Sequence, residues 1–167
     1  MRRASLLLLL AAASGCASSG AVPAPFPTPG PRRVPAAAPS DPLPLIDRPA
    51  VVGTALSLRG APYRDGGSDP SGFDCSGFVA YVFAQQGLYL PRTVSEQYTE
   101  GNPVASDTLA AGDLVFFSTV APGASHVGIA ISHDQFVHAP SSSGVVRVES
   151  LNAPYWASRF VGTRRIR

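Results

Sequence analysis

The chain has 167 residues, of which 45% are hydrophobic and 14% are charged, and all of its basic side chains are arginines. Its formal net charge of +2 comes from two arginines near the start, because the chain from Cys16 onward holds 11 arginines and 11 acidic residues. Nucleic-acid binding depends on clustered positive charge. The balanced charge gives no electrostatic basis for it, and we expect no nucleic-acid partner.

Residues 1–15 have the composition of a bacterial secretory signal. Two arginines precede a run of leucines and alanines, and residues 13–16 have the sequence ASGC. The apolar run is too short to span a membrane permanently. The ending resembles the lipobox of bacterial lipoproteins, which implies cleavage before Cys16 and acylation of that cysteine. An ordinary cleaved signal with an incidental cysteine is the alternative.

Residues 16–45 comprise Cys16 and a predicted tether. Nine prolines lie between residues 23 and 44, and so many prolines block both helices and sheet pairing. We expect an extended spacer with no packed core. Several acyl chains on Cys16 would hold the protein stably on a membrane. Ala17 after that cysteine resembles outer-membrane lipoproteins, so we expect an exported protein anchored in the outer membrane and facing the periplasm.

Residues 46–167 are enough for one compact domain and too few for two. Three helices are predicted in the first half of this domain. Residues 51–58 carry apolar side chains at helical spacing. Residues 74–86 repeat that spacing, with Asp74 as the expected N-cap. Residues 93–98 begin with the pattern of a capping box.

Four short segments rich in β-branched and aromatic residues follow, and turn-forming residues separate them. This composition predicts strands. Helices followed by strands predict an α+β domain, in which the helices pack on one face or end of an antiparallel sheet. The arginines near the C-terminus are typical of a solvated strand or helix face, and we assign them no function. The predicted strands cover residues 113–118, 126–132, 135–139 and 145–149.

Cys75 lies at the start of the second predicted helix, between a turn-rich stretch and the apolar residues 78–83. Unpaired backbone N–H groups and the positive end of the helix dipole favour a thiolate at such a position. Cys75 is therefore a candidate nucleophile. A disulfide with Cys16 and a cysteine that only fills the core are the alternatives. Acylation of Cys16 would exclude the disulfide.

Three histidines are available to activate such a thiol. His126 and His138 lie on consecutive predicted strands, and hairpin pairing would bring their side chains together on one face. His126 would then be the base, and His138 would orient its ring. His133 is expected to be a solvated turn residue. Zinc bound by Cys75 and the two strand histidines is the competing interpretation, but structural zinc sites favour closely spaced ligand pairs, and we predict no metal.

Six motifs occur in order along the domain: residues 62–67 (PYRDGG), 74–79 (DCSGFV), 90–93 (LPRT), 112–117 (GDLVFF), 125–129 (SHVGI) and 136–139 (FVHA). Together they resemble the NlpC-type family of bacterial cell-wall cysteine peptidases. The resemblance implies a papain-like fold, in which a helix carries the nucleophile and a sheet packed against it supplies the histidines. It implies Cys75 as nucleophile, His126 as base and His138 as the third polar residue of a triad.

The resemblance also assigns roles around the thiol. Tyr63 matches a tyrosine thought to assist the oxyanion in this family, together with the backbone N–H of Cys75. A tyrosine that only packs beside the site is the alternative. Asp74, Ser76 and Ser125 match positions that line the cleft, and in some relatives the first two hold the free amine of the substrate. Helix-capping and turn bonds are the alternative for these three residues.

The family cleaves the peptide stems of peptidoglycan, commonly between γ-D-glutamate and diaminopimelate or lysine. The resemblance implies acyl transfer through the thiol, with no cofactor. The alternatives are an envelope scaffold or adaptor that binds wall peptides without cutting them, and an amidase or transferase with the same thiol chemistry. We expect a monomer whose partners are stem peptides and the membrane at Cys16, and a regulatory protein partner stays open.

Overall fold

The computed structural model describes residues 46–167. The predicted signal, the acylation site Cys16 and the tether up to residue 45 lie outside the described residues. Among residues 46–167, no helix is both long enough and apolar enough to cross a membrane.

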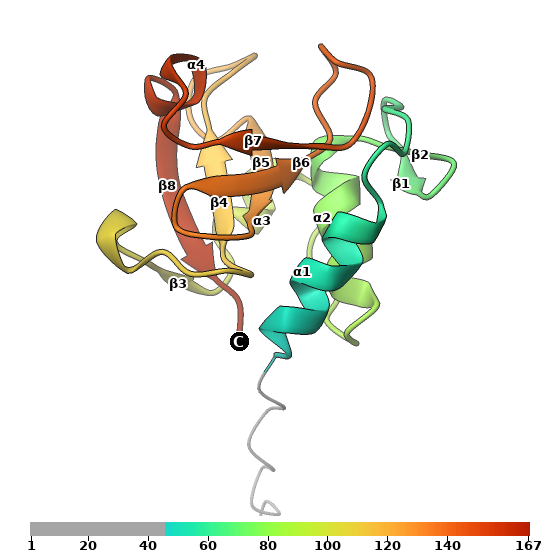
Figure 1. The fold of residues 1–167 in the computed structure, drawn as a ribbon, viewed down its shortest axis with the longest axis horizontal. Helices are drawn as coiled ribbons and strands as arrows, with labels where there is room; N and C mark the ends of the chain where they lie inside the picture. The colour runs from blue at the N-terminus through green and yellow to red at the C-terminus, as the bar shows by residue number, and fades with distance from the viewer. Residues whose placement is uncertain (1–45) are drawn as a thin grey trace, which may run out of the picture. The chain divides into compact units, whose positions relative to one another are not determined.

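The two longer helices lie against one side of an antiparallel sheet in the described domain (Figure 1). The two longer helices, α1 (Arg48–Ser57) and α2 (Cys75–Ala84), both bury apolar side chains in the same core. The shorter elements are α3 (Val94–Gln97), α4 (Pro154–Ala157) and the 3-10 helix η1 (Ser106–Thr108). This arrangement confirms the predicted α+β class, and the three predicted helices correspond to α1, α2 and α3.

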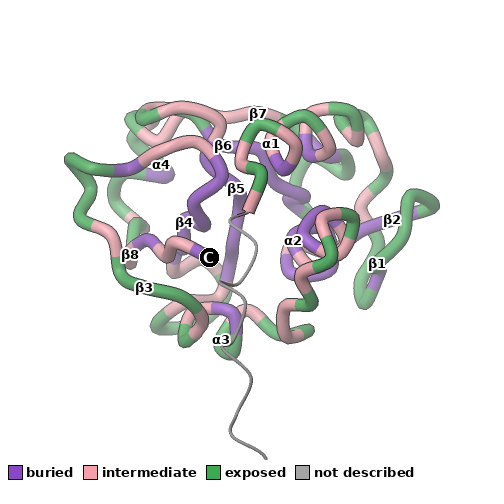
Figure 2. Tube along the Cα trace, turned by 90° about the horizontal axis from the view of Figure 1, so that it is seen from below, coloured by how far each residue is buried: buried purple, intermediate pink, exposed green. Residues whose placement is uncertain are grey.

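The main sheet has six strands within the described residues, in the order β3, β8, β4, β5, β6, β7, and all neighbouring pairs are antiparallel. The central strands β4 and β5 are buried along their whole length (Figure 2). The four predicted strands are present as β4 to β7, with ends that differ by at most two residues. The strands are β3 (Asn102–Pro103), β4 (Leu114–Phe117), β5 (His126–Ala130), β6 (Gln135–His138), β7 (Arg147–Ser150) and β8 (Phe160–Arg165). A separate two-stranded sheet of β1 (Ser68–Asp69) and β2 (Gly72–Phe73) precedes α2.

Strand β8 is absent from the sequence prediction, because its alternation is broken by a glycine and ends in two arginines. These arginines are not simply solvated. Arg165 donates to both carboxylate oxygens of Asp113, at 2.9 and 2.8 Å, and the Arg164 guanidinium lies 4.6 Å from the centre of the Tyr98 ring. Asp113 is fully buried and also accepts from Arg48 at 2.9 Å. One carboxylate therefore ties the start of α1 to the centre of the sheet.

Helix α2 presents Cys75 as its first residue. The side chain of Asp74 caps the helix by accepting the backbone N–H of Gly77 at 2.7 Å. A Cβ atom on Gly77 would lie 2.0 Å from the carbonyl oxygen of Gly67, so this close approach requires glycine. The helix is held against the sheet by four fully buried side chains, Phe78, Val79, Val82 and Phe83. Core packing and capping together fix the place of the thiol.

Candidate active site

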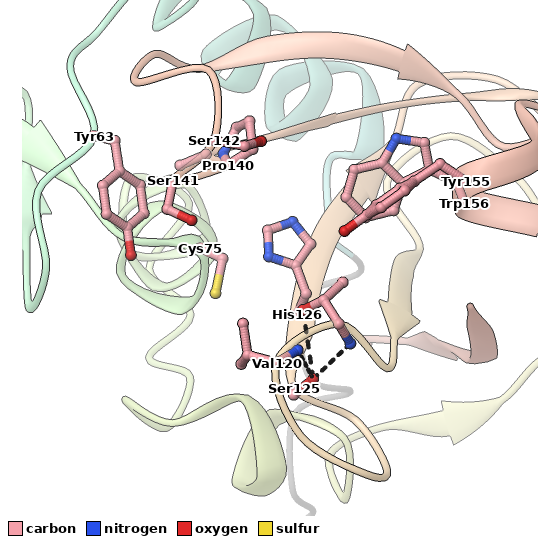
Figure 3. Close-up of a pocket in the computed structure, with 12 residues that line it drawn as sticks. Tyr63, Cys75, Val120, Ser125, His126, Pro140, Ser141, Ser142, Tyr155 and Trp156 are labelled. Atoms are coloured by element: carbon pink, nitrogen blue, oxygen red, sulfur yellow. Dashed lines mark hydrogen bonds between the residues drawn. The ribbon is translucent and has the colours of Figure 1, made fainter. Parts of the chain in front are cut away.

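A cleft of about 160 Å³ lies where the starts of α2 and β5 meet (Figure 3). Cys75 and His126, the first residues of these two elements, both line it. Tyr63, Ser125 and Trp156 line it as well, and Figure 3 shows the His126 ring between Cys75 and Trp156. Among the described residues that line the cleft, none is an aspartate, glutamate or arginine. The structure therefore brings the predicted nucleophile and base into one largely uncharged cleft.

The two strand histidines contact each other directly. Nε2 of His126 lies 2.7 Å from Nδ1 of His138, with the ring planes at 88°. This contact follows from the antiparallel pairing of β5 with β6. Because Nε2 of His126 is turned toward His138, its Nδ1 is the nitrogen left to face the thiol. This orientation is compatible with the predicted roles of His126 as base and His138 as its orienter.

Burial disfavours the charged forms of Cys75, His126 and His138. It raises the pKa of the Cys75 thiol, and the Asp74 carboxylate adds to this effect, while backbone N–H groups of Val127 and Ser76 act in the opposite direction. Burial also lowers the pKa of His126 to about 4 and holds the pKa of His138 lower still. Burial therefore favours the uncharged form of both the thiol and the imidazole. Desolvation thus opposes the stabilisation of a thiolate that we expect from the helix N-terminus.

Tyr63 lines the same cleft, but its hydroxyl group already has a partner. It donates to Oδ1 of Asp65 at 2.7 Å, and this hydrogen bond is the main cause of a pKa raised above the ordinary value for tyrosine. The hydroxyl proton is thus directed at a carboxylate. An oxyanion contact from Tyr63 would require the hydroxyl to turn away from Asp65.

Asp74 and Ser76 form a cluster with Arg92 rather than part of the cleft wall. The Arg92 guanidinium donates to the two carboxylate oxygens of Asp74 at 2.9 and 2.5 Å, and to Oγ of Ser76 at 2.9 Å. Arg92 belongs to the LPRT motif, but no role is predicted for it from sequence. The Arg92–Asp74 ion pair could not be predicted from sequence, because it forms only when the loop after α2 returns to the start of that helix.

Ser125 lines the cleft, and its hydroxyl group organises the preceding loop. Its Oγ accepts the backbone N–H of Thr119 at 2.8 Å and also contacts the backbone of Val120 and Ala121. These contacts are the turn bonds that the sequence analysis left open as the alternative for Ser125. A substrate would therefore meet a loop shaped by this residue.

Two residues around the histidines were missed by the sequence analysis. Trp156, which is 5% exposed, stacks on the His126 ring at 5.4 Å between centroids. Its indole N–H donates to the carboxylate of Glu149 at 2.5 Å. Trp156 is the only tryptophan of the chain, which is a weak signal, and nothing local in the sequence connects it to His126.

The geometry offers no zinc site at the thiol. Among residues 46–167, no group of three or more histidine, cysteine, aspartate or glutamate side chains is placed to hold a metal ion. His126 and His138 also direct one nitrogen each at the other ring instead of at a common point.

Comparisons with known proteins identify the domain. Residues 60–165 match the model of the NlpC/P60 family. The chain belongs to this family. It is 49% identical over 109 residues to the murein DD-endopeptidase MepS/murein LD-carboxypeptidase of Escherichia coli (strain K12), a match that covers 65% of this chain and 57% of that protein. It is 46% identical over 118 residues to the gamma-DL-glutamyl hydrolase of Bacillus subtilis (strain 168), which covers 69% of this chain and 28% of that protein.

The fold has close counterparts among solved NlpC/P60 structures. The NlpC/p60 domain of the peptidoglycan hydrolase SagA matches with a TM-score of 0.65 and 34% sequence identity, over 72% of this chain and 100% of that chain. This likeness confirms the predicted papain-like arrangement of helices on an antiparallel sheet. The chain spans little more than half of MepS, so the likeness concerns the shared domain.

Proposed function

We propose that this protein is a cysteine endopeptidase that hydrolyses the stem peptides of peptidoglycan. The observation that carries the proposal is the meeting of Cys75 and His126 in one cleft, with His138 at 2.7 Å from the His126 ring. Membership of the NlpC/P60 family supports it. The names of the relatives, a murein endopeptidase and a glutamyl hydrolase, support this substrate class.

In the proposed reaction, Cys75 gives its proton to Nδ1 of His126 as the sulfur attacks the amide carbonyl carbon. The carbonyl oxygen then carries a negative charge, which the backbone N–H of Cys75 would stabilise, with the Tyr63 hydroxyl as a second donor. Protonated His126 returns the proton to the departing amine as the C–N bond breaks. Water, deprotonated by His126, hydrolyses the thioester and restores the thiol. These steps require no cofactor.

We propose that His138 acts by stabilising the imidazolium that forms on His126 during the attack. With Nε2–H of His126 donating to Nδ1 of His138, the His126 ring is held with its other nitrogen toward the thiol. Because burial keeps His138 uncharged, it can accept this hydrogen bond instead of repelling a second positive charge.

The proposed scissile bond is the one between γ-D-glutamate and diaminopimelate. The B. subtilis relative is named for a gamma-DL-glutamyl bond, which supports this choice. The second candidate is a bond between two D-centres, which the name of the 49% identical E. coli relative favours. Asp74 and Ser76 are proposed to contribute to recognition of a free stem amine, and such an amine would have to share Asp74 with Arg92.

We propose the following organisation for the whole chain: an export signal in residues 1–15, acylated Cys16 with a tether up to residue 45, and the peptidase domain in residues 46–167. The anchor would place the enzyme on the periplasmic face of the outer membrane, within reach of the wall. Mass spectrometry of the mature N-terminus tests this organisation. An unmodified Cys16 would contradict the anchor.

The proposed activity is tested by digesting purified peptidoglycan with the wild-type protein and with Cys75→Ala and His126→Ala variants. The released fragments are weighed by mass spectrometry. We expect the wild type to release stem-peptide fragments and both variants to lose at least about a thousandfold in rate, since a triad acts as one unit. Circular dichroism confirms that each variant is folded.

The masses of the fragments separate the alternatives. Cleavage between γ-D-glutamate and diaminopimelate leaves a dipeptide on muramic acid, whereas an amidase releases the whole stem and a DD-endopeptidase opens crosslinks. Wild-type protein that binds the wall but releases nothing would establish the scaffold instead. Unchanged activity in both folded variants would refute the assigned nucleophile and base.

A further inference from the structure

The outer nitrogen of His138 is buried and faces a carboxylate. His138 is fully buried, and within the described part of the chain its Nε2 has no hydrogen-bond partner. Oε1 of Glu149, on the neighbouring strand β7, lies 3.9 Å from this nitrogen. A buried, unpaired ring nitrogen is costly, so this pair needs a functional explanation.

The proton arrangement of the two histidines explains why a carboxylate is useful there. If His126 donates from Nε2 to Nδ1 of His138, then Nδ1 of His138 carries no proton. A neutral imidazole has one proton, so that of His138 must be on Nε2. Nε2–H is a donor, and the carboxylate of Glu149 faces it at 3.9 Å. The carboxylate thus selects the tautomer that the proposed reaction requires.

Glu149 is itself held in place by two contacts. The indole N–H of Trp156 donates to Oε2 at 2.5 Å, and Nε of Arg147 forms an ion pair with Oε1 at 3.0 Å. Trp156 also stacks on His126, so the residue that fixes the carboxylate also fixes the base. The side chain of Glu149 is 25% exposed, which leaves its charge only partly screened.

We propose that Glu149 is a positioning residue that acts through His138. Its carboxylate attracts the Nε2–H of His138 across 3.9 Å, keeps Nδ1 of that ring free to accept from His126, and stabilises the positive charge that arises on His126 when Cys75 loses its proton. The inference rests on the proposed function, in which this proton transfer starts the reaction. Glu149 touches neither the cleft nor the thiol.

Among the described residues, His126, Arg147 and Glu149 face His138 and act in different directions. His126 and Arg147 oppose positive charge on the ring, whereas the negative charge of Glu149, 3.9 Å from Nε2, favours it. Arg147 also contacts Glu149 and offsets part of its charge. We therefore expect Glu149 to have only a moderate effect on proton transfer from Cys75 to His126. Removal of the carboxylate should lower the population of the thiolate–imidazolium pair about tenfold, which equals one pKa unit.

The test measures alkylation of Cys75 by iodoacetamide as a function of pH, quantified on the Cys75 peptide by mass spectrometry. Glu149→Gln keeps the shape and removes the charge, Glu149→Asp keeps the charge on a shorter side chain, and Glu100→Gln makes the same chemical change outside the cleft. Near pH 7 we expect Glu149→Gln to react about tenfold more slowly than wild type. Glu149→Asp should lie between them, and Glu100→Gln should match wild type.

The pH profile distinguishes this role from a merely structural one. At alkaline pH, where the thiol loses its proton to solvent without help from His126, the rates of Glu149→Gln and wild type should converge. Equal rates for these two proteins at neutral pH, or an equal loss at every pH, would overturn the inference.

A second measurement needs no variant. Nitrogen NMR of the wild-type histidine rings should show His138 protonated on Nε2, and protonation on Nδ1 would overturn the inference. Neither measurement uses peptidoglycan, so failure of the proposed function is seen separately. A protein with the expected alkylation profile that digests no wall would refute the peptidase proposal and leave the role of Glu149 intact.

Discussion

The buried histidine pair should make the folded protein sensitive to mild acid. His126 is 8% exposed and His138 is fully buried. Burial lowers the pKa of His126 to about 4 and that of His138 further, whereas a histidine in the unfolded chain titrates near about 6.5. Between these values the unfolded state binds protons that the folded state does not. The contribution to stability is therefore complete above about pH 6.5 and is lost as the pH falls toward 4.

The size of this loss follows from the width of the window. Each imidazole changes the free energy of unfolding by about 1.4 kcal/mol per pH unit while only the unfolded form is protonated. Between about pH 6.5 and pH 5, one histidine therefore lowers stability by about 2 kcal/mol, and the pair by about 4 kcal/mol. This is a large part of the roughly 5–15 kcal/mol that stabilises an ordinary domain.

Urea denaturation near pH 7 and near pH 5 measures the loss directly. The wild type should lose about 4 kcal/mol between these conditions, and His126→Gln should lose about 2 kcal/mol less, because it lacks one buried imidazole. His133, whose side chain is 84% exposed, provides the matched control, and His133→Gln should lose as much as the wild type. A wild-type loss of stability below about 1 kcal/mol would refute the reasoning. So would a finding that His126→Gln and His133→Gln reduce this loss equally.

Two further predictions concern residues that stabilise the fold around the cleft. Asp113→Ala should destabilise the fold by about 3 kcal/mol in urea denaturation near pH 7, because it leaves two partly buried arginine side chains without their carboxylate; a loss below about 1 kcal/mol would contradict this. Gly128→Ala would place a Cβ atom 2.6 Å from the ring of Phe136 and should cost about 1–3 kcal/mol. Gly53→Ala, which meets nothing within 4 Å in α1, should instead stabilise by up to about 1 kcal/mol, and equal effects at the two glycines would refute the steric explanation.

The features predicted well from sequence are those encoded by neighbouring residues. The start of α2 is marked by Asp74 at the N-cap and by the apolar spacing that follows it, so the place of Cys75 could be read locally. His126 and His138 are 12 residues apart on two consecutive strands, and a short hairpin brings such residues together. Their direct contact could therefore be anticipated.

The missed features depend on segments that are distant in the sequence. Trp156 reaches His126 across 30 positions of the chain, and Arg165 reaches Asp113 across 52. No local sequence pattern predicts either contact. The effect of burial on the pKa of Cys75 was missed for a different reason, since the helix N-terminus can be inferred from sequence but the depth of burial that opposes it cannot.

The cap of α2 imposes opposite demands on its own nucleophile. Asp74 has to accept the Gly77 N–H to begin the helix, yet its negative charge raises the pKa of the adjacent thiol. Arg92 reconciles the two demands, because its guanidinium binds both carboxylate oxygens and so offsets the charge without removing the cap. At the other end of the site, Glu149 supplies negative charge on the side where His126 has to become positive. The charges outside this uncharged cleft are thus placed where they would favour the proposed transfer of a proton from Cys75 to His126.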